Sequence, residues 1–309
     1  MGLVVTNLVK RFGSKVAVDH LSLQMEEPGV FGLIGTNGAG KTTSIRMILG
    51  IMSADEGSSA WNGTPISRDT LSFGYMPEER GIYMKNKVLE QLVYFGMLRG
   101  MNRSDARKSA LSYLERLGMS EYKDTLVEKL SKGNQQKIQL IATLVHNPEL
   151  IFLDEPFSGL DPVNTEVLRG LLGELIEEKR YIVMSSHQMG TVEEYCKDIL
   201  ILHHGQTKLQ GNLRKIKQGY GHTNLVVSCD VNIDETAAGL GLTVIEKRAG
   251  ETEYRIQGDD MANALLSHMV SQGFYPTKFE IREPSLSEIF IEKVGEASWN
   301  KSGPYLYSP

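Results

Sequence analysis

The chain has 309 residues, of which 41% are hydrophobic and 23% are charged, and its net charge is −5. This length suggests about two domains with ample material for a buried core, and a negative net charge argues against a nucleic-acid partner. The N-terminal run MGLVVTNLVKRFG shows no secretory signal, and no apolar run reaches the roughly 18 residues that span a bilayer. Cys196 and Cys229 form neither a disulfide framework nor a metal-binding spacing.

Strands and helices alternate through the first two thirds of the chain. The pattern predicts short strands within 3–25, a strand at 30–34, a turn-rich stretch at 53–64, a strand near 72–76, helices across 87–146, a strand at 150–153, a helix at 164–179 and a strand at 181–184. Alternation of this kind favours a parallel sheet covered on both faces.

A second domain is predicted after a composition shift at 217–222, which resembles a linker. The remaining pattern has the order β-α-β-β-α-β, which is typical of a ferredoxin-like α+β domain. Its elements are a strand at 224–229, a short helix near Glu235, strands at 242–247 and 253–257, a helix at 260–272 and a strand at 275–282, with an added helix at 285–294. The tail at 298–309 is predicted to be loose.

A glycine-rich run, G-T-N-G-A-G-K-T-T at residues 35–43, links the 30–34 strand to a helix. The pattern G-x-x-x-x-G-K-[ST] in a strand–turn–helix setting predicts a phosphate-binding loop. Lys41 would bring positive charge to the β- and γ-phosphates, and the Thr42 hydroxyl suits Mg²⁺. The residues expected to contact a nucleoside triphosphate are Gly35, Thr36, Asn37, Gly38, Ala39, Gly40, Lys41, Thr42 and Thr43.

Two carboxylates, Asp154 and Glu155, follow the apolar run at 150–153. The carboxyl ends of strands in an open α/β sheet are where ligands collect, so these acids are expected beside the phosphate loop. We expect Asp154 to hold Mg²⁺ and Glu155 to polarise the attacking water.

Five motifs in this order resemble those of ABC-transporter ATPase subunits, and the resemblance covers nearly the whole chain. Besides GTNGAGKT and LIFLDEP, they are LSKGNQQ at 130–136, close to the LSGGQ signature, SGLD at 158–161, which matches the D-loop, and His187, which matches the switch histidine. The resemblance implies an α/β fold: an ABC-type P-loop cassette at 1–218 with a mostly parallel core sheet, an antiparallel β subdomain and a helical subdomain at about 84–147. A small accessory domain at 222–297 would follow.

The resemblance also implies that two cassettes pack head to tail, with the signature of one capping the ATP of the other. The signature residues are Ser131, Lys132, Gly133 and Asn134. Without the other motifs, Ser131 would be interpreted as an ordinary helix N-cap. His187 would contact the γ-phosphate and water, Asp161 would shape the dimer interface, and Phe12 would stack on adenine.

Three positions depart from the family pattern: Glu78, and Lys132 and Asn134, which replace the Gly and Gln of the signature. Glu78 replaces the usual Q-loop glutamine, where it could still coordinate Mg²⁺, and it resembles the exporter subgroup of drug-resistance and sodium-extrusion type. Lys132 either supplies a further cation to the ATP of the partner or faces solvent. The pair His203-His204 is interpreted as structural or exposed rather than as a metal site.

The function implied is ATP hydrolysis, with Mg²⁺, that drives a separate integral-membrane permease, with the subunit peripheral on the cytoplasmic face of the membrane. The second cassette is expected to be an identical copy, although a heterodimer is also compatible. Two alternatives stay open: a soluble ABC ATPase that acts on ribosomes, DNA or assembly of iron–sulfur clusters, and a module whose ATPase is vestigial. A single cassette without a heptad run argues against the first of them.

Overall fold

The computed structural model describes residues 2–67, 73–79 and 81–295. It divides into two compact units, Met1–Gln210 and Gly211–Pro309. The sequence prediction ended the first domain at 218, but helix α7 (Leu213–Tyr220) belongs to the second unit, so the expected linker at 217–222 begins inside a helix. The predicted loose tail and the first residue of the strand predicted near 72–76 lie outside the described residues.

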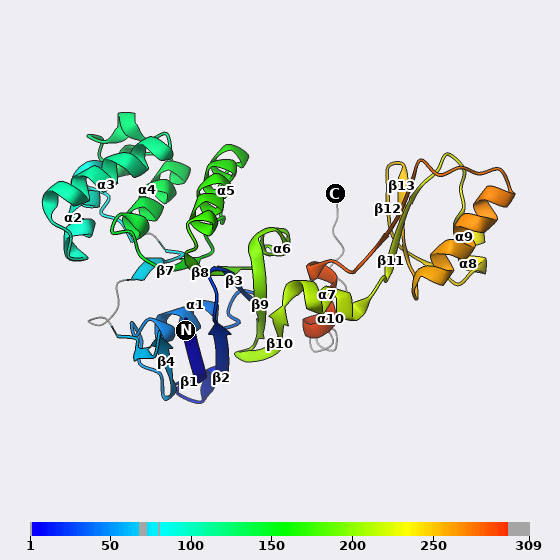
Figure 1. The fold of residues 1–309 in the computed structure, drawn as a ribbon, viewed down its shortest axis with the longest axis horizontal. Coiled ribbons are helices and arrows are strands. Elements are labelled where there is room, and N and C mark those ends of the chain that lie inside the picture. Colours follow the sequence, from blue (N-terminus) through cyan, green and yellow to red (C-terminus); the bar gives the residue numbers. More distant parts are fainter. Residues whose placement is uncertain (1, 68–72, 80, 296–309) are drawn as a thin grey trace. The chain divides into compact units, whose positions relative to one another are not determined.

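Ten described strands of the first unit form one curled sheet (Figure 1). Their order is β5 (Thr64–Pro65), β4 (Glu56–Trp61), β1 (Leu3–Phe12), β2 (Lys15–Met25), β10 (Gln206–Asn212), β9 (Cys196–His203), β3 (Gly29–Ile34), β8 (Tyr181–Ser186), β7 (Leu150–Asp154) and β6 (Phe73–Met76). The strand β3 pairs in parallel with β8 and β9, and β7 does so with β6 and β8. The strands β1, β2, β4 and β5 pair antiparallel. The mostly parallel core and the N-terminal antiparallel part are therefore confirmed.

The stretch at 53–64 was predicted to be turn-rich, and that prediction was wrong. Its residues 56–61, E-G-S-S-A-W, form β4 because they pair with β1, a partner more than forty positions away. Small and polar residues carry little strand signal of their own, so here the pairing partner decides the conformation.

The parallel strands owe their position to continuous apolar runs. Every residue of β7 is buried, and so are the last five residues of β3 and of β8. Phe31, Phe152 and Val183 from these three strands share one hydrophobic cluster. Burial on both faces is what a parallel sheet requires, and it places the carboxyl end of β7 at one edge of the core.

Helices of the first unit are α1 (Lys41–Ile48), α2 (Val88–Leu98), α3 (Arg103–Arg116), α4 (Lys132–Leu144), α5 (Pro162–Glu177) and α6 (Met189–Tyr195), with 3₁₀ turns at Ser120–Tyr122 and Val127–Lys129. Side-chain caps set several N-termini: Asn102 accepts from the Asp105 N–H at 2.9 Å, and Asp161 accepts from the Asn164 N–H at 2.9 Å. The helices α2, α3 and α4 group together beyond the sheet, where a helical subdomain was expected (Figure 1).

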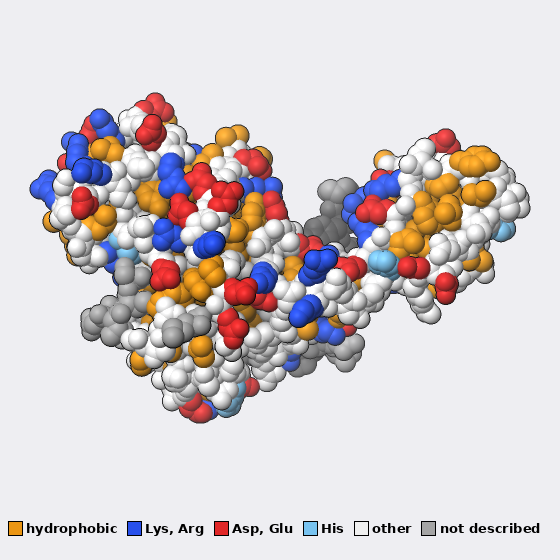
Figure 2. Space-filling view, in the orientation of Figure 1, with side chains coloured by type: hydrophobic (Ala, Val, Ile, Leu, Met, Phe, Trp, Pro, Cys, Tyr) orange, Lys and Arg blue, Asp and Glu red, His pale blue; other side chains and the backbone are white. Residues whose placement is uncertain are grey.

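The second unit has a four-stranded antiparallel sheet in the order β12 (Thr243–Arg248), β13 (Glu251–Arg255), β11 (Asn224–Ser228), β14 (Lys278–Arg282). The helices α8 (Asp234–Gly239) and α9 (Asp259–Ser271) lie on one face of it (Figure 1), which is the ferredoxin-like arrangement. Its core includes Leu225, Tyr254 and Leu265. The added helix is α10 (Leu286–Gly295). Hydrophobic side chains also reach the surface of this unit (Figure 2). Tyr275 is an exposed aromatic residue of the same unit.

Among the described residues, no helix combines the length and the apolar character needed to cross a lipid bilayer.

Candidate active site

The phosphate loop leaves β3 at Ile34 and enters α1 at Lys41. Gly38 and Gly40 have φ values of 79° and 111°, a left-handed backbone that side chains with a Cβ adopt only with strain. A Cβ on Gly35 would lie 2.6 Å from the Leu202 carbonyl oxygen, so this glycine is required by close packing. The loop therefore combines left-handed backbone at two glycines with close packing of Gly35 against the neighbouring strand.

The three residues predicted to be catalytic lie together at the carboxyl ends of the strands. Lys41 Nζ donates to the Gly35 carbonyl at 2.7 Å and lies 3.1 Å from Glu155 Oε1. His187 Nδ1 lies 2.8 Å from Glu155 Oε2. The Lys41 and Glu155 side chains are 7% and 4% exposed, so their charges attract each other in a region of low effective dielectric. Because Glu155 Oε1 has no aligned hydrogen bond, its contact with Lys41 is an ion pair only.

The backbone at Glu155 is unusual, because a non-glycine residue there has φ of 52°. Such a conformation costs of order 1 kcal/mol or more and persists where surrounding contacts enforce it. Ser185 supplies those contacts: its Oγ accepts from the Glu155 N–H at 3.1 Å, and its carbonyl oxygen lies 3.2 Å from the same nitrogen. The Ser185 hydroxyl also donates to Asp154 Oδ1. One buried serine thus fixes the backbone of Glu155 and contacts the carboxylate of Asp154.

A cavity of about 710 Å³ lies over the phosphate loop. Most of the predicted nucleotide contacts line it: Phe12, Thr36, Asn37, Gly38, Gly40, Lys41, Thr42 and Thr43. Gly35 and Ala39 are buried behind this wall. Glu78 also lines the cavity, with Lys15, Val16, Ala17 and His204.

A smaller cavity of about 240 Å³ adjoins the catalytic carboxylates, and Asp154, Glu155, Lys132 and Ser158 are among the side chains that line it. Glu78 lines this cavity too, so it connects the two spaces. Asp154 Oδ2 is buried without a hydrogen-bond partner. An orphaned carboxylate oxygen of this kind suits a cation.

The signature packs against helix α5, which follows the D-loop in the chain. Ser131 N-caps α4, with its Oγ 3.3 Å from the Asn134 nitrogen, so the local cap is present. Gly133 packs so closely on Asn164 that a Cβ would lie 2.5 Å from its Nδ2. Asn164 is fixed by Asp161, whose Oδ2 accepts from that Nδ2 at 2.6 Å. Hydrogen bonds from the backbone and side chain of Asn164 lower the pKa of Asp161.

Two family models match the chain. The model described as ABC transporter matches residues 18–158, and the C-terminal domain of DrrA1-3-like ATP-binding proteins matches residues 211–294. The ABC transporter ATP-binding protein YhaQ of Bacillus subtilis is 44% identical over 294 residues, which cover 95% of this chain and 98% of that protein. The chain belongs to the ABC transporter ATP-binding proteins. It is therefore an ATP-binding, ATP-hydrolysing subunit coupled to transport.

Other relatives and structures agree with this assignment. The linearmycin resistance ATP-binding protein LnrL of Bacillus subtilis is 28% identical over 305 residues. The alignment covers 95% of this ABC subunit and 98% of LnrL. A solved ATP-binding subunit of an ABC transporter is 28% identical and superposes with a TM-score of 0.66, covering 72% of this chain and 94% of that one. The MJ0796 cassette, solved as a dimer with ADP and Pi, superposes with a TM-score of 0.63 at 21% identity. The match covers 69% of this chain and 99% of that one, and at this identity it supports the fold alone.

Several residues of this ABC subunit reach the site without a signal in the sequence. His204 is exposed, in agreement with its interpretation as structural or exposed, and it also lines the larger cavity. Gly205 beside it is bonded to the phosphate loop, with its N–H donating to the Ala39 carbonyl at 2.9 Å. Ser185 lies inside an apolar strand pattern, where a serine indicates nothing. Gln139 of α4 was also missed. Like Gln136, the last residue of the LSKGNQQ motif, it donates to a loop of the site.

Proposed function

We propose that this subunit dimerises around two ATP molecules and powers a separate membrane permease in the export direction, peripheral to the cytoplasmic face of the membrane. The observation that supports a dimer is the position of the signature at 131–134. Among the described residues, no signature residue lines the cavity over the phosphate loop, and Lys132 alone of the four lines the smaller cavity beside Glu155. ABC ATP-binding subunits generally work as dimers with permease components, and a second signature supplied by a partner cassette would close the cavity.

Hydrolysis would depend on the buried charge group at the strand ends. Lys41 would stabilise charge on the β- and γ-phosphates. Glu155, held in place by Ser185, would orient and polarise the attacking water, and His187 would fix the geometry in which Glu155 acts. Because these groups are already positioned by the fold, little reorganisation is needed when the phosphoryl group transfers.

Thr42, Asp154 and Glu78 would hold Mg²⁺ with ATP. The fit is chemical: hard oxygen donors, one of them the unpartnered Asp154 Oδ2. Within the described ranges no cluster of three or more His, Cys, Asp or Glu side chains could hold a metal alone. Phosphate oxygens and water would therefore complete the coordination, as Mg²⁺ commonly requires. When bound, the ion would supply charge neutralisation at the phosphates.

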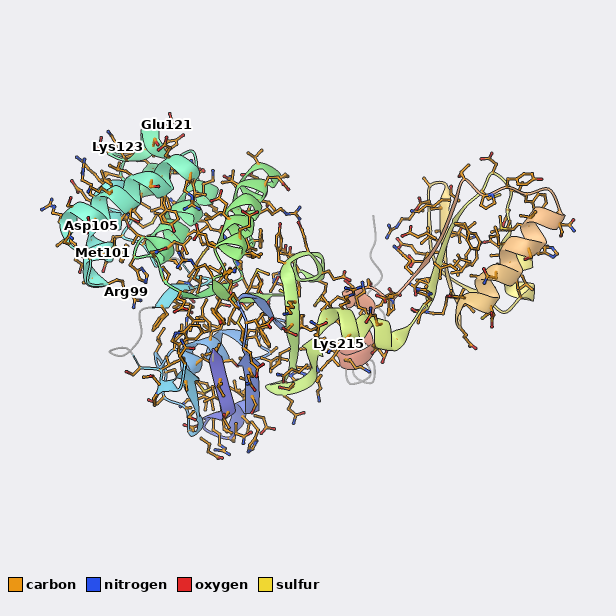
Figure 3. The ribbon with its side chains drawn as sticks, in the orientation of Figure 1. Arg99, Met101, Asp105, Glu121, Lys123 and Lys215 are labelled. Atoms are coloured by element: carbon orange, nitrogen blue, oxygen red, sulfur yellow. The ribbon has the colours of Figure 1, made fainter. Side chains whose placement is uncertain are left out.

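The permease would dock on the first unit beside the Glu78 segment. A groove of about 380 Å³ there is lined by residues that include Pro77, Phe95, Leu98 and Arg99. Leu98 is 61% exposed and Tyr94, which packs on Phe95, is 47% exposed. Exposed apolar and aromatic groups of this kind mark interaction surfaces. Arg99 lies at the end of α2, with its guanidinium 4.9 Å from the centre of the Phe73 ring (Figure 3).

Export is supported by Glu78 and by the second unit. The second unit matches the DrrA1-3-like C-terminal domain, and LnrL is named for linearmycin resistance. The transported molecule would be contacted by the permease, so the direction is tested with the permease present. When ATP and the transported compound are enclosed in vesicles that carry the complex, the compound should leave the vesicles. Uptake into such vesicles would contradict export.

The decisive experiment is Glu155→Gln, which keeps the shape of the side chain but removes the base. We expect ATPase activity to fall at least about 100-fold while ATP still binds, so that a dimer with trapped ATP accumulates. Phosphate release and size-exclusion chromatography with ATP measure both effects.

The matched control is Glu174→Gln, which changes an exposed glutamate paired with Arg116 and should leave turnover unchanged. Wild-type turnover in Glu155→Gln would refute the catalytic role, and a monomer that persists with saturating ATP would refute the dimer.

A further inference from the structure

Helix α4 and strand β6 are joined by a row of side-chain hydrogen bonds to alternate carbonyls. His146, just beyond α4, has Nε2 3.1 Å from the Phe73 carbonyl. Thr143 Oγ1 lies 3.3 Å from the Tyr75 carbonyl. Gln139 Nε2 donates to the Pro77 carbonyl at 2.7 Å and to the Glu79 carbonyl at 3.1 Å. We call this row, His146–Thr143–Gln139, the α4 ladder.

The spacing of the α4 ladder follows from elementary geometry. β6 is the last strand of its sheet, so its carbonyls on the outer side have no strand partner. Alternate residues of a strand direct their carbonyls to the same side, and positions 139, 143 and 146 recur on one face of a helix. Gly74 permits the close approach, since a Cβ there would lie 2.7 Å from the Thr143 carbonyl oxygen.

Gln139, the last member of the α4 ladder, makes its bonds beyond the end of β6, on either side of Glu78. Gln139 is only 5% exposed, and both N–H groups of its amide are used on the residues immediately before and after Glu78. Glu78 itself is exposed and lines both cavities of the site. The Glu78 segment has left the sheet at this point, and the two hydrogen bonds of Gln139 tie it to helix α4.

The other end of the same helix carries the signature. Ser131 caps α4 two turns before Gln139, and Gln136 between them donates to the Pro156 carbonyl at 2.5 Å, beside Glu155. One rigid helix therefore contacts the signature end, the catalytic carboxylate segment and the Glu78 segment.

We propose that Gln139 is a positioning residue for Glu78. By fixing the segment to α4, it makes Glu78 and Ser131 parts of one body, so a shift of the Glu78 segment moves the signature that would face the ATP of the partner. The expected effect on binding of Mg·ATP rests on the proposed role of Glu78 beside Mg²⁺ and ATP. The attachment of the Glu78 segment to α4 by Gln139 does not depend on that role.

The tie is tested by Gln139→Met, which keeps the length of the side chain and removes both donors. Gln135→Met is the matched control, because the Gln135 amide also donates to two carbonyls. These are Val127 at 3.1 Å and Leu130 at 3.0 Å, which precede the same helix. We expect amide exchange of segment 73–79 in the full chain to rise about ten-fold in Gln139→Met and to stay unchanged in Gln135→Met. Unchanged exchange in Gln139→Met would overturn the proposal.

The nucleotide consequence is tested by binding of ATP with Mg²⁺ and of ATP with EDTA, without turnover. Gln139→Met should weaken binding of Mg·ATP about ten-fold, leave binding of ATP in EDTA unchanged, and add nothing in a Glu78→Gln background. Additive effects in the double variant would overturn positioning through Glu78. If Glu78→Gln alone leaves Mg·ATP affinity unchanged, the metal role of Glu78 is wrong, and the exchange experiment alone decides the tie.

Discussion

The two units differ in how their buried polar side chains are satisfied. In the first unit Asp154 and Glu155 are almost fully buried, and each has one carboxylate oxygen without a hydrogen bond. In the second unit Asn224 is 1% exposed and lies at the centre of a closed network, in which it bonds to Glu253, Glu288 and Arg255. Among residues 211–295, no buried side-chain nitrogen or oxygen lacks a partner. The two carboxylate oxygens without a hydrogen bond line a cavity and suit a ligand, whereas the closed network of the second unit suits a structural role.

Electrostatics reinforce this difference. Burial by itself raises the pKa of Glu288, but hydrogen bonds from Asn224 and Ser285 and the charge of Arg255 together outweigh it, so the pKa lies below its usual value. The carboxylate is thus stabilised by the fold. The second unit therefore uses these charges for its own stability.

The largest expected effect tests the closed network. Asn224→Leu removes the amide at its centre and leaves Glu288 and Arg255 partly uncompensated, so the second unit should lose about 3 kcal/mol of unfolding free energy. Chemical unfolding of the full chain, followed by near-UV signals of both units, measures it. Glu246→Gln, which removes an exposed ion pair with Arg248, should change nothing. If Asn224→Leu also lowers ATPase activity while the first unit stays folded, the division of roles is wrong.

A second prediction separates the units by pH. Burial, aided by the charge of Arg99, lowers the pKa of His146 to about 4 from its ordinary 6.5. Between those values the unfolded chain binds a proton that the folded chain does not, so acid destabilises the first unit in that window. We expect a loss of about 1–2 kcal/mol between pH 7 and pH 5 from His146 alone. The Glu288 contribution, with a depressed pKa, is instead present above its unfolded value near 4.5 and lost as pH falls below it.

Urea unfolding at pH 7 and pH 5 checks this difference. The first unit of His146→Gln should show a smaller change between the two pH values than the wild type. His268→Gln, at an exposed site of α9, should behave as the wild type does. An equal acid response in His146→Gln and the wild type would contradict the assignment.

The smallest expected effect concerns the base end of the nucleotide cavity. Phe12 is 50% exposed at the end of β1 and lines the cavity, so Phe12→Ala should weaken ATP binding about ten-fold by removing a stacking surface. Binding of tripolyphosphate, which has no base, should not change. Tyr275→Ala, an exposed aromatic change in the second unit, should affect neither ligand. Equal losses for ATP and tripolyphosphate would show that Phe12 supports the loop instead of the base.

Much of the fold was predictable because its signals are local. Glycine spacing predicts the phosphate loop, and apolar runs predict the strands β3, β7 and β8. Alternating patterns predict the ferredoxin-like order of the second unit. The misprediction at 53–64 shows where this ends. The strand β4 has weak intrinsic preference and exists because β1 pairs with it.

The sequence by itself determined which chemical groups are present: a phosphate loop, two acids after a buried strand, a signature and a histidine in a fixed order. Only the tertiary structure decided how they meet, since strands far apart in the chain bring Glu155 to 3.1 Å from Lys41 and to 2.8 Å from His187. It also decided the roles of Ser185 and Gln139, which no pattern marks. The physical reason is that hydrogen bonds between distant segments depend on register and packing, and neither leaves a periodic trace in the sequence.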